Sequence, residues 1–355
     1  MPETACLKVP KNLGEQAIRL VAELDLFNRE LQIQQTEDSL CIPLASEPST
    51  AVLNTFKTKL STFEISVHDF AMREKHHLVP LDFLADKLPH ALLAGLPRAI
   101  DFVGDIAIVE IPPELSTYKG AIGEAILNAH KQICTVLAKS GAVEGVYRLR
   151  DFEVIAGAKK TVTVYREYGC TYHVDVAKAY FSPRLSSEHD RVASQVKTGE
   201  TVIDLFAGVG PFAIPIAKKQ KNVRVYAVDV NPDAVALMKR NVAVNRAEKQ
   251  VVPFLGDARQ VVREHLSGKA DRVIMNLPET ALEFVDVACE AIKPGGGIVH
   301  YYGFVKDSDP LETAQVLLTE AVKQNMRQVT KFLLAKSVRE VAPYTWQVVV
   351  DAQIQ

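Results

Sequence analysis

The chain lacks several features that would assign it to a class of protein at once. Its 355 residues contain no apolar stretch near the ~20 residues that a membrane-spanning helix needs. The opening residues, MPETACLKVP, have neither the basic region nor the apolar core of a signal peptide. We therefore expect a cytoplasmic protein that does not associate with membranes.

The spacing of cysteine and histidine and the net charge argue against disulfide-rich, metal-binding and strongly basic proteins. The five cysteines are scattered singly, without CxxC spacing, and the nine histidines show no ligand spacing, so neither a disulfide framework nor a metal site is expected. The net charge of −2 gives no general argument for nucleic acid. Between Lys139 and Arg184, however, eight Lys or Arg residues stand against five acidic ones. This local excess is compatible with RNA binding, although solvated strand faces would also produce it.

The length exceeds one typical domain, and the N-terminal pattern changes near residue 70. Residues 13–27 have roughly helical periodicity, and residues 30–44 are typical of two short strands around a turn. We interpret residues 1–70 as a small α+β module. Residues 71–98, with mixed polarity and three prolines, are expected to form a connector with short helices.

The remainder divides near residue 178. Within 99–177 we expect an α+β middle domain, with a strand at 101–115, a helix at about 118–138, and strands at 146–157 and 160–177. The region 178–355 alternates between strand and helix patterns, and its clearest helix, Asn231–Ala247, opens with a capping Asn and a proline. Strands are expected at 201–206, 223–230, 251–256, 272–277 and 297–303, followed by an antiparallel pair at about 328–337 and 345–353.

Polar residues follow the apolar strands of this last region in order. They occur in VIDLFAGVGPF (202–212), AVDV (227–230), GDAR (256–259) and NLPE (276–279). In open α/β sheets the carboxyl ends of the strands form the ligand site. Four such polar groups in succession therefore predict a binding site there, whereas AGVG alone would be an ordinary turn.

The glycines and acids of these segments indicate the kind of ligand. Gly208 and Gly210 allow the backbone to approach a ligand closely, and Asp229 is placed to accept hydrogen bonds from a ribose diol. The dinucleotide pattern GxGxxG is incomplete, since position 213 is Ala. S-adenosylmethionine, a nucleoside without a pyrophosphate, fits these features. In NLPE, Asn276 and the N–H-free Pro278 favour hydrogen bonding to a nucleobase edge.

Several segments together resemble the archaeal and eukaryotic tRNA (guanine-N1)-methyltransferases that modify guanosine 37. The segments are DFVGDIAIVEIP (101–112), YRLRDFEVIAG (147–157), DVAKAYFSPRLSSE (175–188), DLFAGVGPF (204–212), AVDVNPDAV (227–235), MNLPE (275–279) and HYY (300–302). The resemblance implies a class I, Rossmann-like S-adenosylmethionine-dependent methyltransferase domain, an α+β RNA-binding middle region and a small α+β N-terminal module. The N-terminal module is similar only in outline, and in the family it checks the outer corner of the tRNA.

The resemblance also implies residue roles. Glu188 corresponds to the general base at guanine N1, and Arg148 corresponds to the group that stabilises charge on O6. Substrate contacts are implied for Tyr180, Arg184, Asn276 and Pro278. Cofactor contacts are implied for His189, Phe206, Gly208, Gly210, Asp229, Val230, Asp257, Ala258 and Asn276. The family often has Arg directly after the general base, where this chain has His189, so the contribution of this side chain to cofactor binding is expected to be smaller or pH-dependent.

A general base and a guanidinium suit this chemistry, because guanine N1–H is too weakly acidic to react unaided at neutral pH. Glu188 also has a structural interpretation, as a first-turn carboxylate of a helix capped by Ser186 or Ser187. We expect tRNA as partner, S-adenosylmethionine as cofactor, no metal and a monomer. Three alternatives stay open: aminocarboxypropyl transfer in wybutosine synthesis, methylation of an exocyclic amine, and a non-catalytic RNA-binding relative. The second normally has an aromatic residue after the proline, where this chain has Glu279.

Overall fold

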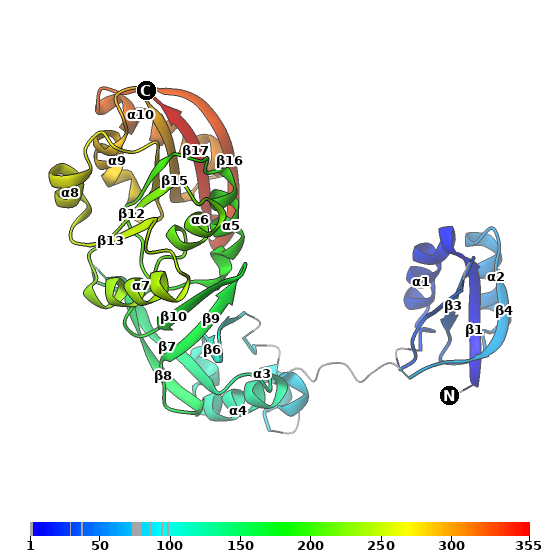
Figure 1. The fold of residues 1–355 in the computed structure, drawn as a ribbon. Coiled ribbons are helices and arrows are strands. Elements are labelled where there is room, and N and C mark those ends of the chain that lie inside the picture. The colour runs from blue at the N-terminus through cyan, green and yellow to red at the C-terminus, as the bar shows by residue number, and fades with distance from the viewer. Residues whose placement is uncertain are drawn as a thin grey trace. The chain divides into compact units, whose positions relative to one another are not determined.

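The computed structural model describes residues 3–28, 30–36, 38–72, 80–84, 87–93, 95–97, 99–145 and 147–355. The chain forms two compact units, Met1–Val79 and Pro80–Gln355, which are described separately (Figure 1). No helix in the described ranges is long and apolar enough to cross a membrane.

The N-terminal unit is an antiparallel sheet with two helices. Its strand order is β2-β3-β1-β4. The strands are β1 (Glu3–Pro10), β2 (Gln34–Gln35), β3 (Ser39–Pro43) and β4 (Glu64–Asp69), and the helical segments are η1 (Lys11–Leu13), α1 (Gly14–Glu23) and α2 (Thr50–Lys59). Sequence periodicity predicted α1, β2 and β3 but not β1, α2 or β4.

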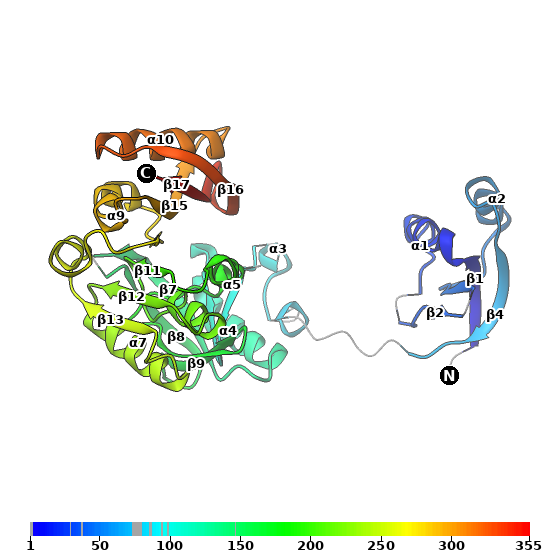
Figure 2. The same cartoon turned by 45° about the horizontal axis from the view of Figure 1, so that its top comes forward.

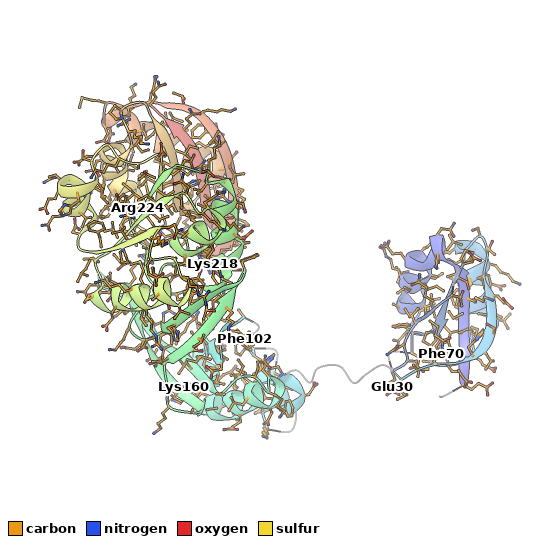
Figure 3. All side chains as sticks on the ribbon, viewed as in Figure 1. Glu30, Phe70, Phe102, Lys160, Lys218 and Arg224 are labelled. Carbon is orange, nitrogen blue, oxygen red and sulfur yellow. The ribbon has the colours of Figure 1, made fainter. Side chains whose placement is uncertain are left out.

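Alternation along β1 gives this sheet two different faces. Leu7 and Val9 pack with Ile42 of β3 and with side chains of α1 and α2 in the main core of the unit. Cys6 lies on the other face with Cys41, Leu31 and Phe70, the last of which is labelled in Figure 3. Helix α2 is capped by Ser49, whose hydroxyl accepts a hydrogen bond from the Val52 N–H.

The second unit begins with a four-stranded sheet of order β5-β6-β7-β8. Its strands are β5 (Ile100–Val103), β6 (Ile106–Val109), β7 (Thr135–Glu144) and β8 (Leu149–Gly157). Around them lie η2 (Pro80–Phe83), α3 (His90–Leu93), η3 (Pro113–Tyr118) and α4 (Lys119–Ala129). Phe102 of β5, labelled in Figure 3, packs edge-on against His130, with ring centroids 4.8 Å apart.

Three predictions for this region were wrong in extent. The strand expected at 160–177 is a hairpin of β9 (Val162–Glu167) and β10 (Cys170–Asp175). The helix expected at 118–138 ends at Ala129, because the following apolar residues form β7, which pairs in parallel with β6. A short apolar run has no periodicity that separates a buried strand from a helix. The strand expected at 101–115 is a hairpin of β5 and β6 that turns at Gly104, where φ is 58°.

The hairpin of β9 (Val162–Glu167) and β10 (Cys170–Asp175) connects this sheet to the rest of the unit. Its buried residues, Tyr172 among them, share one core with side chains of β11 (Thr201–Asp204), α5 (Ser186–Gln195), α6 (Ala213–Lys219) and α7 (Pro232–Val244). Asn241 of α7 accepts the His173 N–H at 2.7 Å, and its amide donates to the Val209 carbonyl at 3.1 Å. The core is therefore continuous across residue 177.

The largest sheet has seven strands in the order β13-β12-β11-β14-β15-β17-β16. They are β11 (Thr201–Asp204), β12 (Arg224–Asp229), β13 (Val251–Leu255), β14 (Arg272–Met275), β15 (Gly297–Lys306), β16 (Val329–Ala342) and β17 (Thr345–Ile354). Strands β11 to β15 run parallel, whereas β17 pairs antiparallel with β15 and β16. The parallel sheet with a final antiparallel pair confirms the predicted methyltransferase architecture.

Helices cover both faces of this sheet. One core holds side chains of α5 (Ser186–Gln195), α6 (Ala213–Lys219) and α7 (Pro232–Val244), and a second holds those of α9 (Val285–Ala291) and α10 (Pro310–Gln324). Figure 2 shows α9 and α10 on the side of the sheet opposite α5 and α7. Shorter segments are η4 (Pro183–Leu185), α8 (Ala258–Val261), the π-helical η5 (Val262–Leu266) and η6 (Ala281–Phe284). Asn231 caps α7 as predicted, by accepting from the N–H groups of Asp233 and Ala234.

Candidate active site

A cavity opens at the carboxyl ends of β11, β12 and β14, where an open α/β sheet binds ligands. It contains about 1210 Å³ of space including its open mouth. We call it the main cavity. The predicted site residues that line it are Arg148, Tyr180, His189, Phe206, Gly208, Asp229, Val230, Asp257, Ala258, Asn276 and Pro278. Glu188, Arg184 and Gly210 are not among its lining residues.

The glycine turn after β11 is built around Asp229. Its Oδ2 accepts the Gly208 N–H at 2.7 Å, and its Oδ1 accepts the Asn231 N–H at 2.9 Å. Gly208 and Gly210 have φ values of 53° and 93°, a conformation that glycine adopts without strain. Burial raises the pKa of Asp229, against the lowering effect of these N–H donors. The carboxylate thus stabilises the turn as well as facing the cavity.

The next strand end supplies Asp257 and an aromatic wall. Asp257 caps α8, where its Oδ1 accepts from the N–H groups of Arg259 and Gln260. Phe206 and Phe284 meet edge to face across the cavity lining, with centroids 5.0 Å apart. Phe284 was not predicted, because nothing in its local sequence distinguishes it from a core residue.

The NLPE segment brings one unsatisfied polar atom into this space. The Oδ1 of Asn276 is buried and has no hydrogen-bond partner among the described residues. Such an atom is costly unless a ligand or water supplies a donor. The Pro278 carbonyl is already engaged, since it accepts the Phe304 N–H at 3.0 Å.

Arg148 stands in a tight turn before β8, with a left-handed φ of 54°. Its guanidinium donates two hydrogen bonds to Glu279, Nη1 to Oε2 at 2.5 Å and Nη2 to Oε1 at 2.7 Å. This geometry connects the middle region to the loop after β14. The hydrogen bond from Arg148 lowers the pKa of Glu279 more than partial burial raises it.

Glu188 is the sequence neighbour of His189 in the main cavity lining but is not itself a lining residue. It is 0% exposed and contacts Arg191 Nε at 2.8 Å, the Tyr302 hydroxyl at 3.0 Å and Lys336 Nζ at 2.5 Å. Burial alone would raise the pKa of Glu188, but Lys336 and Arg191 outweigh it, so the pKa lies below its ordinary value. The expected serine cap was wrong: α5 starts at Ser186, and Leu185 occupies the capping position without a side-chain bond.

His189, also on α5, lines the main cavity. Its Nδ1 lies 2.7 Å from Glu167 Oε1, and its ring packs edge-on against Phe212 at 4.7 Å between centroids. Glu167, on the β9–β10 hairpin, was not predicted, because a pairing across 22 residues leaves no local pattern.

A second cavity, the side cavity, adjoins the main one and shares Arg148, Tyr180 and Phe304 with it. Arg184 lines the side cavity and forms an ion pair with Asp101 of β5. The basic residues around the side cavity are Lys139, Arg148, Arg150, Arg184 and Arg339. Arg339 of β16 also lines the main cavity and was not predicted.

Comparison with known proteins agrees with this architecture. Residues 163–330 match the TRM5/TYW2 methyltransferase domain, residues 81–161 the TYW2 N-terminal domain and residues 6–52 the tRNA methyltransferase 5 N-terminal domain. The tRNA (guanine(37)-N(1))-methyltransferase Trm5b of Pyrococcus abyssi is 36% identical over 351 residues, 99% of each chain. The chain belongs to the tRNA (guanine(37)-N(1))-methyltransferase family.

Solved structures of family members show the same fold. The crystal structure of Pyrococcus abyssi Trm5b superposes with a TM-score of 0.72 at 35% identity, covering 99% of both chains. The complex of aTrm5 with tRNALeu gives a TM-score of 0.68 at 31% identity, also covering 99% of both chains. Methanocaldococcus jannaschii Trm5 in complex with adenosine gives 0.64 at 31% identity, covering 98% of both chains.

Proposed function

We propose that this protein transfers a methyl group from S-adenosylmethionine to N1 of guanosine 37 in tRNA. The observation that supports it most is the main cavity, where Asp229, Asp257 and Asn276 meet Arg148 from the middle region. Relatives that match the whole chain carry this activity in their names, and one relative was solved with tRNA. We place the protein in the cytoplasm, where its free cysteines would stay reduced. We expect one protein chain to bind each tRNA.

The main cavity fits S-adenosylmethionine on its own chemistry. Asp229 offers carboxylate oxygens for ribose hydroxyls, and Asp257 offers an acceptor toward adenine, beside the wall of Phe206 and Phe284. Gly208 leaves open the space that a side chain would take from the ligand, with the Tyr180 carbonyl as the nearest atom to its missing Cβ, at 3.6 Å. When bound, S-adenosylmethionine supplies an electrophilic methyl group.

We assign the guanine to two further lining residues, Asn276 and Arg148. The unsatisfied Oδ1 of Asn276 can accept a hydrogen bond from an N–H of the base. Arg148 can donate to O6, where charge grows as N1 loses its proton, so it stabilises the transition state more than the ground state. The base leaves the anticodon-loop stack at lower cost than a duplex base would.

We further propose Glu188 as the general base. Its low pKa keeps it ionised at neutral pH, and its neighbour His189 lines the cavity. Because Glu188 is turned toward Arg191 and Lys336, the carboxylate must rotate toward the guanine when tRNA is bound. Proton removal by such a group contributes roughly 10²–10⁴-fold.

The test is incubation with unmodified tRNA transcript and S-adenosylmethionine carrying its label in one of two positions. We expect label from the methyl group in the tRNA and none from the methionine carboxyl carbon. Transfer of the carboxyl label would instead show aminocarboxypropyl transfer. Absence of both labels, with cofactor binding intact, would leave an RNA-binding protein without activity.

A further inference from the structure

We infer that Glu279 is a positioning residue, which holds the Arg148 guanidinium in the plane and direction needed to meet guanine O6. This inference rests on the proposed methylation and adds a residue to it. The two residues are 131 positions apart and come from different regions of the unit, yet they form a two-point contact at 2.5 and 2.7 Å. Paired N–H···O bonds fix orientation as well as distance.

The position of Arg148 makes such a support necessary. Its backbone lies in a turn with φ 54°, closed by its own N–H bonded to the Gly145 carbonyl at 3.1 Å. Without a partner, the long and flexible Arg148 side chain would sample many rotamers. The population of the one rotamer that faces the base would then be lower. The loop of Glu279 is itself fixed, because the Thr280 and Ala281 N–H groups bond the Leu277 carbonyl and the Pro278 carbonyl accepts from Phe304.

The pair leaves Arg148 able to act. A guanidinium has five N–H donors, and Glu279 uses two of them. The others are available to O6 while the contact with Glu279 persists. The Arg148 side chain is 18% exposed and that of Glu279 is 53% exposed, so the carboxylate stands on the solvent side of the guanidinium.

Glu279 has a second consequence for RNA binding. The side cavity that both residues line holds five basic and four acidic side chains, and an Arg148 without Glu279 would be attracted to the phosphates of the anticodon loop. The negative charge of Glu279 opposes that competing contact. Glu279 thereby favours base contact over phosphate contact for this arginine.

The experiment is single-turnover methyl transfer by the full-length protein at saturating tRNA and cofactor. Glu279→Gln should be about tenfold slower or worse, with tRNA affinity unchanged or tighter, since an anion near phosphates is removed. In an Arg148→Ala background, Glu279→Gln should slow transfer no further, because its effect acts through Arg148. The Tm of Glu279→Gln should equal that of the wild-type protein, because the Glu279 side chain is half exposed; this comparison checks that the variant folds.

The matched control is Glu110→Gln, which removes another carboxylate from the side cavity, one paired with Lys139 at 3.4 Å. Its rate should stay within about twofold of wild type. A wild-type rate for Glu279→Gln, or an undiminished effect of it on the Arg148→Ala background, would overturn the inference. The rates of all variants are measured on whichever product the wild-type protein forms. The dependence of the Glu279→Gln effect on Arg148 therefore tests the inference, while the identity of that product tests the proposed N1 methylation.

Discussion

The substitution Glu188→Gln distinguishes a catalytic role of Glu188 from a purely structural one. The amide keeps the shape of the side chain and can still hydrogen-bond Tyr302, but it does not accept the guanine proton. If Glu188 is the base, single-turnover methyl transfer should fall roughly 10²–10⁴-fold, a loss of about 3 to 5 kcal/mol in transition-state stabilisation. The affinities for cofactor and tRNA should change little, because the interaction is used mainly in the transition state.

The structural cost of the same substitution is smaller and can be measured separately. Arg191 keeps its ion pair with Asp351, with Nη1 at 2.5 Å from Oδ2, and the Lys336 side chain is 40% exposed, so neither cation is left buried and unpaired. We expect a loss of about 1–3 kcal/mol in the free energy of unfolding, seen as a modest fall in Tm.

The control is Asp190→Asn on the same helix, which removes a carboxylate paired with Lys219. It should leave the single-turnover rate unchanged. If Glu188→Gln lowers Tm but transfers methyl at the wild-type rate, Glu188 is a structural carboxylate and the general-base assignment is wrong.

Three further predictions concern the cofactor, the pH dependence and the N-terminal unit. Asp229→Ala should weaken S-adenosylmethionine binding at least tenfold, about 1.4 kcal/mol, while tRNA binding survives; an unchanged calorimetric affinity would contradict the ribose assignment. Lys336→Gln removes a cation that lowers the pKa of Glu188, so the acidic limb of the pH–rate profile should move to higher pH, while Lys331→Gln on the same strand should not move it. A fragment spanning Pro80–Gln355 should fold, bind cofactor and lose affinity for whole tRNA more than for an isolated anticodon stem-loop; equal losses would show that the N-terminal unit does not read the distant part of the tRNA.

The Lys336 prediction has a counterpart in stability. The folded-state pKa of Glu188 lies below its ordinary value of 4.5, so its ionised form stabilises the fold above that pH. This contribution is lost as the pH falls through the lower folded-state pKa. In Lys336→Gln the folded-state pKa of Glu188 lies closer to 4.5, so the contribution should be smaller and its loss should be complete at a higher pH, which acid unfolding monitored by circular dichroism would detect.

The sequence predicted those parts of the site that follow from local pattern. Apolar strands that end in Asp229 and Asp257, with glycines after β11, predict a ligand site, because parallel strands place their carboxyl ends at one edge of the sheet. The Asn231 cap is likewise local. The helix expected at 118–138 was wrong because apolar residues suit a buried strand as well as a helix.

The contacts that decide chemistry were not predictable from local pattern. Arg148 meets Glu279 across 131 residues, and His189 meets Glu167 through a hairpin packed on another helix. Glu188 was identified by resemblance, but its enclosure by Arg191, Tyr302 and Lys336 depends on strands that pair only in the folded sheet. Such pairings require the tertiary fold, since no periodicity connects their members.

The most direct test of the central claim is to locate the methyl group on the product. Wild-type protein is incubated with an unmodified tRNA and with an identical tRNA that has adenosine at position 37, and both are digested and mapped by mass spectrometry. We predict one methyl group, on N1 of guanosine 37, and no incorporation into the adenosine variant. A methyl group on an exocyclic amine or at another position, or equal incorporation into both tRNAs, would contradict the account.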